Sequence, residues 1–209
     1  MRNTFDRFNG RHQDYQAARP SYAQEFLDWL GELYAPPERY TAADIGSGTG
    51  KLSAQLLAAG FRVCGVEPNP DMRGAAEALL GGDPRFSSSN GTDHDTGLPD
   101  RSVDMVAAAQ AFHWFDGPAF ARECRRILRP GGRAVLVWNV RGSAPVNQAL
   151  AQVFREHCPS FHGFTGGMGE DDPRIRDFFG GAYEKRRFPN PLTLDRDQFL
   201  RRDRKSTRL

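Results

Sequence analysis

Apolar and polar positions follow one another in blocks that predict alternating strands and helices. The apolar residues within 26–33 recur three and four positions apart, which is typical of a helix with one buried face. A short apolar run at 42–45 predicts a covered strand, and leucines at helical spacing within 52–57 predict a helix soon after it. A glycine-rich turn, residues 46–50, joins the two elements.

The same alternation continues further along the chain. Strands are predicted at 61–66, 85–88, 102–109 and 134–138, helices at 70–80, 118–128 and 146–157, and a further strand at 182–188. Gly60 is expected to end a helix in the left-handed conformation and Asn69 to cap the next helix, while 130–132 predict a tight turn and 163–173 a loop. This order favours an α/β fold with a doubly wound, mostly parallel sheet, helices on both faces, and a ligand at the carboxyl ends of the strands.

Composition narrows the class of protein without pointing to a partner. The 209 residues suffice for one domain with a substantial core. A net charge of +2 with 26% charged residues creates no strong field for nucleic acid or a membrane surface. The chain has no apolar run of about 20 residues, and residues 1–11 are too polar for a signal peptide, so we expect a cytoplasmic location. The three cysteines, Cys64, Cys124 and Cys158, lack metal or redox spacing and are expected to be reduced.

The chain divides into three parts on these patterns. Residues 1–35 are expected to form an N-terminal lid and helix, and residues 36–202 the ligand-binding domain. Residues 203–209 change character abruptly and are interpreted either as a truncation scar or as a natural basic tail.

Three kinds of nucleotide site compete for the glycine turn. A phosphate-binding Walker loop would need glycine at position 45 and Ser or Thr at position 52, where Ile45 and Leu52 stand, so this interpretation fails. A dinucleotide fingerprint would need its third glycine at Lys51, which weakens that interpretation without excluding it. The third kind is a nucleoside site without a pyrophosphate. Glu67, at the end of the next strand, agrees with this third kind because a carboxylate there can accept two hydrogen bonds from a ribose diol.

Residues 44–50, Asp-Ile-Gly-Ser-Gly-Thr-Gly, resemble at every position the glycine motif of class I S-adenosyl-L-methionine-dependent methyltransferases. Further segments resemble the small-molecule branch of these enzymes, which includes the trans-aconitate methyltransferase-like and methyltransferase type 11 proteins. They lie at 91–104, 109–115, 123–132 and 138–139, with an N-terminal signature of Tyr15 and Arg19-Pro20. The resemblance covers roughly residues 15–200 and implies a Rossmann-like fold. The family usually ends in an antiparallel strand that has no counterpart in this sequence, so that strand is expected to be missing.

The resemblance also implies a role for individual residues. S-adenosyl-L-methionine is the implied cofactor, with its amino group at Asp44 and its ribose at Glu67. The remaining implied cofactor residues are Gly46, Ser47, Gly48 and Gly50 for the methionine part, Pro68 and Met72 for one face of the adenine, Thr92, Asp93 and His94 for the adenine edge, Gln110 beneath the sulfonium, and Tyr15 and Arg19 as a closing lid. Relatives commonly carry a small residue and an acid where Asp93 and His94 stand, and Asp93 is our choice for the adenine amino group.

Methyl transfer from a sulfonium is an in-line displacement that gains mainly from positioning the acceptor and excluding water. By the resemblance, His113 and Trp114 face a small-molecule acceptor, which is an oxygen, nitrogen or carbon nucleophile and could be a carboxylate. His113 is the candidate base, although a histidine beside Trp114 could equally shape the pocket. No metal, nucleic acid or membrane partner is expected, and the chain is expected to be a monomer or homodimer. The alternative is a non-catalytic or truncated protein that binds the same cofactor.

Overall fold

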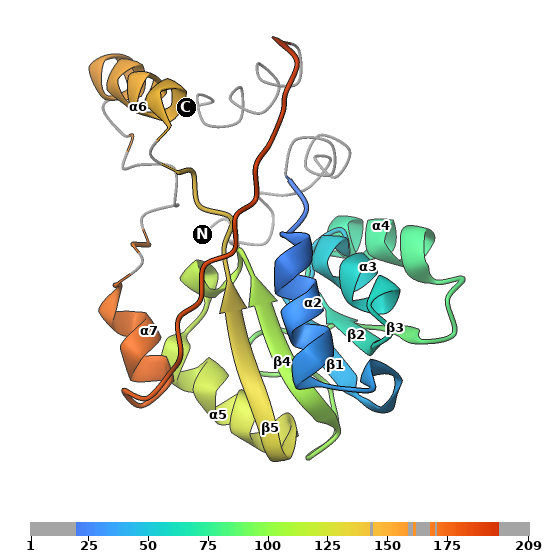
Figure 1. Cartoon of the computed structure of the whole chain (residues 1–209). Helices are drawn as coiled ribbons and strands as arrows, with labels where there is room; N and C mark the ends of the chain where they lie inside the picture. Colours follow the sequence, from blue (N-terminus) through green and yellow to red (C-terminus); the bar gives the residue numbers. More distant parts are fainter. Residues whose placement is uncertain (1–19, 143, 159–160, 162–167, 170, 197–209) are drawn as a thin grey trace.

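A computed structural model describes residues 20–142, 144–158, 161, 168–169 and 171–196 of the chain. The predicted lid over residues 1–19 and the tail at 203–209 lie outside this part. Within it, the elements follow the predicted alternation of strands and helices (Figure 1).

Five parallel strands form a single sheet in the order β3-β2-β1-β4-β5. They are β1 (Thr41–Ile45), β2 (Arg62–Val66), β3 (Phe86–Ser89), β4 (Val103–Ala109) and β5 (Leu128–Val137). The apolar run that predicted a covered strand is the centre of this sheet, because β1 pairs with β2 on one side and with β4 on the other. The direction of the chain across the sheet therefore reverses between β1 and β4, which is where ligands bind in folds of this class. The predicted α/β fold is confirmed.

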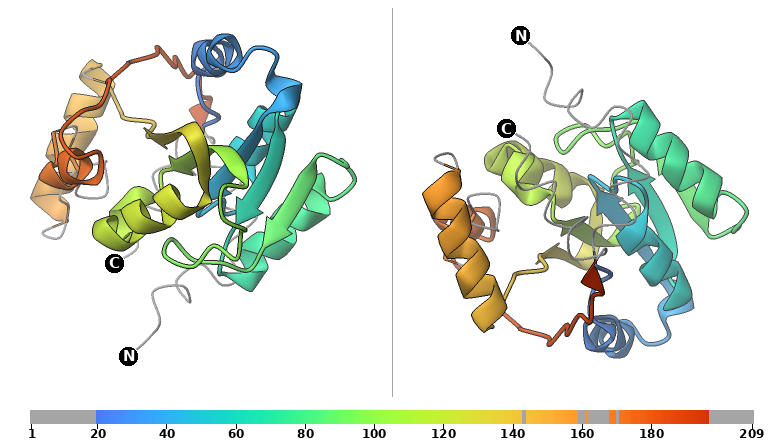
Figure 2. Two further views of the ribbon diagram at one scale, coloured as in Figure 1. Left: turned by 90° about the horizontal axis from the view of Figure 1, so that it is seen from below. Right: turned by 90° about the horizontal axis from the view of Figure 1, so that it is seen from above.

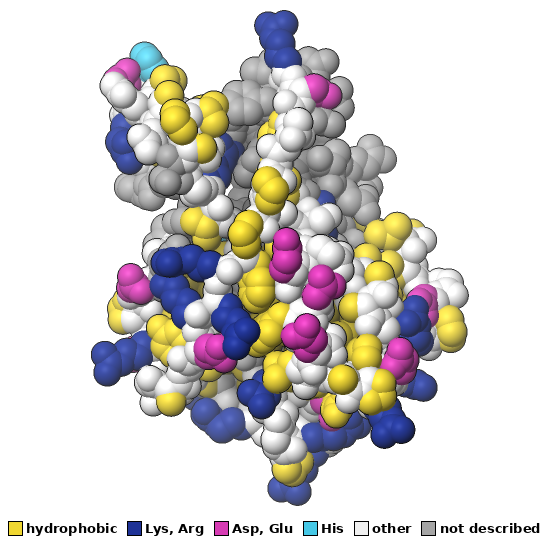
Figure 3. Space-filling view, in the orientation of Figure 1, with side chains coloured by type: hydrophobic (Ala, Val, Ile, Leu, Met, Phe, Trp, Pro, Cys, Tyr) yellow, Lys and Arg dark blue, Asp and Glu magenta, His cyan; other side chains and the backbone are white. Residues whose placement is uncertain are grey.

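Helices cover both faces of the sheet (Figures 1 and 2). They are α2 (Gln24–Leu33), α3 (Lys51–Ala58), α4 (Pro70–Leu80), α5 (Gly117–Ile127) and α7 (Pro173–Phe178), with 3₁₀ turns at Pro37–Arg39 and Phe112–Trp114. Helix α6 (Pro145–His157) stands away from the sheet (Figure 1). No helix in the described part of the chain is both long and apolar enough to cross a membrane. On the face drawn in Figure 3, basic and acidic side chains are interspersed.

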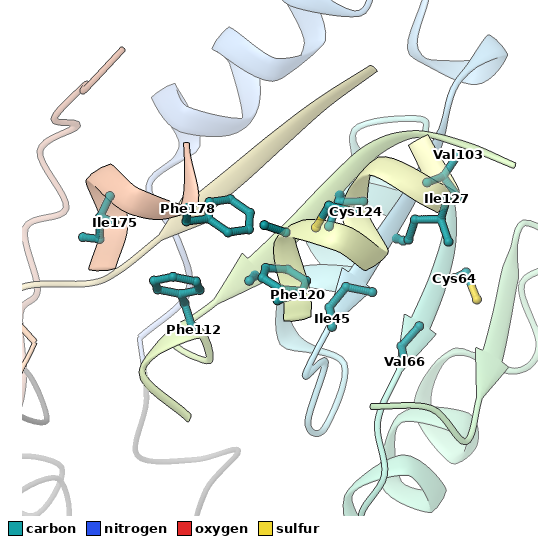
Figure 4. Close-up of a cluster of buried hydrophobic side chains, with 14 of the residues drawn as sticks. Ile45, Cys64, Val66, Val103, Phe112, Phe120, Cys124, Ile127, Ile175 and Phe178 are labelled. Carbon is teal, nitrogen blue, oxygen red and sulfur yellow. The ribbon is translucent and has the colours of Figure 1, made fainter. Parts of the chain in front are cut away.

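Two apolar cores fill the space between the helices and the sheet. One lies between β1, β2 and β4 and helices α5 and α7, where Phe112, Phe120 and Phe178 pack together beside Ile45 (Figure 4). The other core joins α2 and α3 to the opposite face, with Leu30 as its most buried side chain from α2. Because both faces of the sheet are covered, its central strands are apolar on both sides, and this explains the unbroken apolar run in β1.

Local capping follows the sequence closely. Asn69 caps α4, and its side-chain oxygen accepts the backbone N–H of Met72 at 3.0 Å. Gly60 follows α3 with φ +104°, in the region that favours glycine. Cys64 and Cys124 are buried, and all three cysteines are free.

Strand β5 begins earlier than the sequence predicts. The tight turn expected at 130–132 is an irregularity inside the strand, since Val103 pairs with Leu128 and Met105 pairs with Arg133. Gly131 adopts φ +82° and accommodates the extra residues. The proline and glycines that predicted a turn therefore form a bulge at the start of an edge strand.

The strand predicted at 182–188 is wrong, because these residues form no ladder with the sheet. The segment instead leads from α7 toward α2 (Figures 1 and 2). Side-chain contacts hold it there. Phe188 packs on Phe26 and Trp29 with ring centroids 5.8 and 5.9 Å away, and Arg186 lies 5.1 Å over the Trp29 ring. Its aromatic and basic side chains thus contact a helix, and the segment pairs with no strand of the described sheet.

Helix α7 was not predicted. Asp172 caps it by accepting the backbone N–H of Arg174 at 3.0 Å, and Ile175 and Phe178 are buried. Six residues are too few for a helical period to emerge from a glycine-rich and charged region. Most of the loop predicted at 163–173 lies outside the described residues.

Candidate functional site

A cleft of about 320 Å³ opens where the carboxyl ends of β1, β2 and β4 meet. The strand order creates it, because the connections after β1 and β4 leave the sheet toward opposite faces. Its lining comes from five stretches of chain: Gly46 and Gly48; Glu67, Pro68 and Met72; Thr92, Asp93 and His94; Ala109, Gln110 and Ala111; and Trp114, Phe115 and Asp116. Ten of the predicted site residues are therefore brought together in this one cleft.

The three glycines of the turn have different structural roles. Gly46, at φ +68°, lets the turn pass close to the end of β4, because a Cβ there would lie 2.8 Å from the Ala111 side chain. Gly48 has φ +57° and faces open space, so its backbone borders the cleft directly. Gly50 lies outside the lining, and a Cβ on it would meet Leu80 and Ala76 of α4 at 2.9 and 3.1 Å. Its lack of a side chain lets α3 and α4 approach each other.

Glu67 is a buried carboxylate fixed by backbone donors. Its Oε2 accepts the N–H of Gly48 and its Oε1 accepts the N–H of Asn69, both at 2.9 Å. Burial raises the pKa of Glu67, while these two hydrogen bonds and the charge of Arg73 act in the opposite direction. Each carboxylate oxygen can accept more than one hydrogen bond, so the group retains capacity for a ligand in the cleft.

Asp44 lies deeper, at the end of β1, with 1% of its surface exposed. Its Oδ2 accepts the hydroxyl proton of Ser53 at 2.7 Å, whereas its Oδ1 is buried without a hydrogen bond to any described residue. Burial raises the pKa of Asp44 to about 6, against the lowering effect of Ser53 and with a smaller raising effect from Glu67. An incompletely satisfied buried carboxylate beside the glycine turn is suited to a cationic ligand group or an ordered water.

Arg73 fastens the ends of two strands and was missed by the sequence analysis. Its Nη1 donates to the backbone oxygen of Glu67 at 2.8 Å and to Oδ1 of Asn90 at 3.0 Å. The guanidinium therefore holds the end of β2 against the loop after β3 from outside the cleft. Nothing in the sequence singles out one arginine of α4 for this contact.

The loop that carries Thr92, Asp93 and His94 is anchored from behind by Glu123. The backbone N–H and hydroxyl of Thr96 donate to Glu123 Oε1 at 2.9 and 2.6 Å. Burial acts to raise the pKa of Glu123, but its pairing with Arg126 and Thr96 outweighs burial and holds this pKa at about 2. A Cβ at Gly91 would collide with backbone atoms of Thr96 2.4 Å away, so the loop closes tightly on itself.

Asp93 has its oxygens engaged within the protein. Its Oδ2 accepts the backbone N–H of Asp116 at 3.0 Å, and its Oδ1 lies 3.2 Å from Nδ1 of His94. Asp116 in turn caps α5, since its Oδ1 accepts the N–H of Ala119 at 2.9 Å. This arrangement ties the loop after β3 to the start of α5 across the mouth of the cleft.

Gln110 occupies the cleft with an unusual backbone. Its φ of +55° is rare for a residue with a side chain, and such conformations concentrate at functional sites. The side-chain Nε2 donates to the backbone oxygen of Asn139 at 3.0 Å, which fixes the amide relative to the end of β5. The conformation turns the chain sharply out of β4 and into the 3₁₀ turn that follows.

Trp114 and His113 lie on that 3₁₀ turn. Trp114 lines the cleft with 49% of its surface exposed. His113 packs beside the Trp114 ring, with ring centroids 4.9 Å apart, but is not among the residues that line the cleft. Ser47 also lies outside the lining and has its hydroxyl close to Gly65 of β2. Tyr15 and Arg19 fall outside the described residues.

The cleft combines acidic, backbone and apolar surfaces. It offers a buried carboxylate, a glycine backbone and the apolar surface of Pro68 and Met72. No arginine or lysine lines it in the ranges that the structure describes, and no cluster of potential metal ligands occurs there. Four further residues line the cleft and were not predicted from the sequence, namely Ala109, Ala111, Phe115 and Asp116. All four lie within two residues of Gln110 or Trp114 in the sequence, and this proximity could have identified them.

A profile of the family described as "Methyltransferase domain" matches residues 43–136, which include the glycine turn and β1 to β5. An uncharacterised methyltransferase of Mycobacterium tuberculosis is 42% identical over 127 residues, covering 61% of this chain and 49% of that protein. An uncharacterised methyltransferase of Schizosaccharomyces pombe is 32% identical over 147 residues, covering 69% of this chain and 57% of that protein. The chain spans about half the length of these curated relatives.

Solved structures agree on the architecture. A candidate type II methyltransferase from Anaeromyxobacter dehalogenans is 31% identical with a TM-score of 0.52, over 84% of this chain and 70% of that chain. A candidate S-adenosyl-L-methionine-dependent methyltransferase from Methanococcus maripaludis gives a TM-score of 0.60 at 20% identity, over 86% and 85% of the two chains. The likeness to the second protein is one of fold, and it confirms the Rossmann-like prediction.

Proposed function

Because the chain belongs to the methyltransferase-domain family, we propose that it transfers a methyl group from S-adenosyl-L-methionine to a small-molecule acceptor. The observation that carries this proposal is the pair of buried carboxylates, Asp44 and Glu67, at the ends of adjacent strands around a glycine backbone. A sulfonium nucleoside offers the two matching groups, a cationic amino acid portion and a ribose diol.

Most of the proposed cofactor contacts come from residues that line the cleft, whereas Asp44 is buried and does not belong to this lining. Gly46 and Gly48 border the methionine portion, and Glu67 accepts hydrogen bonds from the ribose. The amino group is held by Asp44, whose unsatisfied oxygen supports this assignment. Pro68 and Met72 supply apolar surface for the adenine.

The adenine edge is assigned to the loop after β3. Thr92, Asp93 and His94 line the cleft there, which supports contacts from this loop. Asp93 already accepts the N–H of Asp116, so its carboxylate is positioned before the ligand arrives. Its oxygens can accept a further hydrogen bond from the adenine amino group.

When bound, S-adenosyl-L-methionine would supply an electrophilic methyl group to a lone pair of the acceptor and would leave as the neutral thioether. The protein's contribution is to hold the two reactants in line and to exclude water. Gln110, with its amide fixed by Asn139, borders the sulfonium end, and Trp114 forms a wall for the acceptor. His113 adjoins Trp114 and is the proposed base for an acceptor that must lose a proton.

Several assignments rest on the resemblance alone. Tyr15 and Arg19 are proposed to close over the cofactor, and Ser47 and Gly50 to support its methionine portion through the turn. The division into a lid and helix at 1–35, a domain at 36–202 and a tail at 203–209 is likewise a proposal. The protein is proposed to act as a monomer or homodimer.

Calorimetry with S-adenosylhomocysteine and with NADH tests the proposal. We expect the first compound to bind with 1:1 stoichiometry and the second not to bind. Binding of NADH alone would overturn the proposal. Transfer of a labelled methyl group to members of an acceptor panel then separates an enzyme from a protein that only binds the cofactor.

A further inference from the structure

The acceptor side of the cleft carries its own chemical signature. If the proposed function is right, the glycine turn, the end of β2 and the loop after β3 are occupied by the cofactor. The lining that remains, the acceptor surface, is formed by Ala109, Gln110, Ala111, Trp114, Phe115 and Asp116, and Asp116 adjoins the adenine edge because its N–H is bonded to Asp93. This surface consists of two methyl groups, one amide, two aromatic rings and one carboxylate.

We propose that the acceptor is a flat, apolar molecule carrying a positively charged group, which the carboxylate of Asp116 recognises beside the ring of Trp114. This inference rests on the proposed function and names the substrate class for the same cleft. It departs from the carboxylate acceptor that the sequence leaves open.

Asp116 is held in place without using all of its acceptor capacity. Its backbone N–H donates to Asp93 at 3.0 Å, and its Oδ1 accepts the N–H of Ala119 at 2.9 Å. Its Oδ2 makes no hydrogen bond with another described residue, and the side chain is exposed at the mouth of the cleft. The carboxylate is therefore already fixed before a ligand binds, and little conformational entropy of the Asp116 side chain is lost on binding.

The aromatic rings favour the same sign of charge. Tryptophan is the strongest aromatic partner for a cation, and Trp114 lines the cleft with nearly half of its surface exposed. The faces of its ring and of Phe115 carry negative quadrupole charge, so an anion placed against a ring face is repelled while a cation is attracted.

The charges beside the acceptor surface disfavour an anionic acceptor. Asp116 is the charged side chain of that surface, and His94, on the cofactor side, is the sole side chain of the described lining that can become cationic. The start of α5 contributes a partial positive charge of about one half. The full negative charge of its capping residue, Asp116, exceeds that contribution, so the net field at this position attracts cations.

A matched pair of indoles tests the inference. Tryptamine and indole-3-propionate share a ring and differ in the charge of the side chain. Each is titrated by calorimetry into the full-length protein saturated with S-adenosylhomocysteine. We expect tryptamine to bind about tenfold or more tightly than indole-3-propionate, as an ion pair supported by a cation–π contact should provide.

Two variants locate the effect. Asp116→Asn removes the charge but keeps an oxygen that can cap α5, since asparagine is as good an N-cap as aspartate. It should reduce the preference for tryptamine to less than about threefold, because the remaining cation–π contact is weak. Asp95→Asn removes an exposed charge from the neighbouring loop outside the cleft lining and should leave the preference unchanged.

The outcomes distinguish this inference from the proposed function. Equal binding of the two indoles, tighter binding of indole-3-propionate, or no binding of tryptamine would overturn the inference while binding of S-adenosylhomocysteine keeps the function intact. A preference that survives in Asp116→Asn would also overturn the role of this carboxylate. A protein that binds no S-adenosylhomocysteine would overturn both proposals.

Discussion

Glu67 and Gly48 are joined across the cleft by a hydrogen bond of 2.9 Å, in which the backbone N–H of the glycine donates to Oε2 of the carboxylate. The bond connects the end of β2 to the turn after β1. It fixes the acidic group and the glycine backbone relative to each other before a ligand binds, so both surfaces are preorganised.

Replacing Glu67 by Gln should weaken binding of S-adenosylhomocysteine by about 10- to 100-fold, because hydrogen bonds to a charged acceptor are worth about 1.5 to 3 kcal/mol. The amide would also place an N–H₂ group against one of the two backbone donors. Calorimetry measures the change. Glu77→Gln, on the exposed side of α4, is the control and should bind normally. Unchanged affinity in Glu67→Gln would remove the carboxylate from the ribose contact.

Asp44 makes stability depend on pH in a predictable direction. Burial raises its pKa from 3.8 to about 6, so its protonated form stabilises the folded protein below pH 3.8, and this stabilisation is lost as the pH rises to 6. The cost of ionising the buried group above pH 6 is about 3 kcal/mol. Asp44→Asn should therefore raise the free energy of unfolding at pH 8 and change it little at pH 4. Urea titrations at both values measure this, and an equal effect at both would contradict the prediction.

The same group should control the affinity for the cofactor. An ionised Asp44 attracts the cationic amino group, so binding of S-adenosylhomocysteine should weaken as the pH falls below about 6. Calorimetry between pH 5 and 8 would follow the change. In Asp44→Asn the affinity should be lower at pH 8 and should lose most of this pH dependence. A pH profile identical to that of the unmodified protein would assign the titration to another group.

Two glycine variants separate packing from ligand contact. Gly50→Ala should lower the free energy of unfolding by about 2 to 4 kcal/mol, because it combines a positive φ with collision against Leu80 and Ala76. Gly48→Ala meets open space and should cost about 1 to 2 kcal/mol through its φ alone. The methyl group of Gly48→Ala enters the cleft. Relative to the stability that each variant loses, Gly48→Ala should therefore lose more affinity for S-adenosylhomocysteine than Gly50→Ala does. Denaturant titrations and calorimetry on the pair provide both quantities.

Glu123 should matter for stability although it lies outside the cleft. Its pKa of about 2 means that it stabilises the folded protein above pH 4.5 and that this contribution is lost as the pH falls toward 2. Glu123→Gln should lower the free energy of unfolding at pH 7 by about 2 kcal/mol and should reduce the acid sensitivity. Asp100→Asn, which removes the exposed partner of Arg126, should cost less than about 0.5 kcal/mol. Similar losses in the two variants would contradict a special role for Glu123.

The elements that the sequence predicted well are those with local signals. The run before Asp44, the glycine turn and the helix after it each carry their own periodicity or backbone requirement, and all were found as expected. The carboxylate at Glu67 was predicted because the end of one parallel strand lies beside the end of the next.

The elements that were missed depend on distant contacts. The segment that includes Phe188 was predicted to be a strand, yet it packs by its side chains on Phe26 and Trp29 of α2. Arg73 and Glu123 are ordinary charged residues of helices until the fold brings them to the backs of two loops. The positive φ of Gln110 is likewise set by the junction between β4 and the following turn.

The strand order gives the cleft a second role, in the assembly of the sheet. β1 and β4 are neighbours although some 60 residues separate them, so their pairing closes a long loop and carries a large entropic cost. The cleft lies at the junction between β1 and β4. Glu67 comes from the β1–β2 side of this junction and Gln110 from the β4 side. A bound ligand would therefore act as a tie between the two halves of the sheet, and its binding energy would add to the cooperativity with which they unfold.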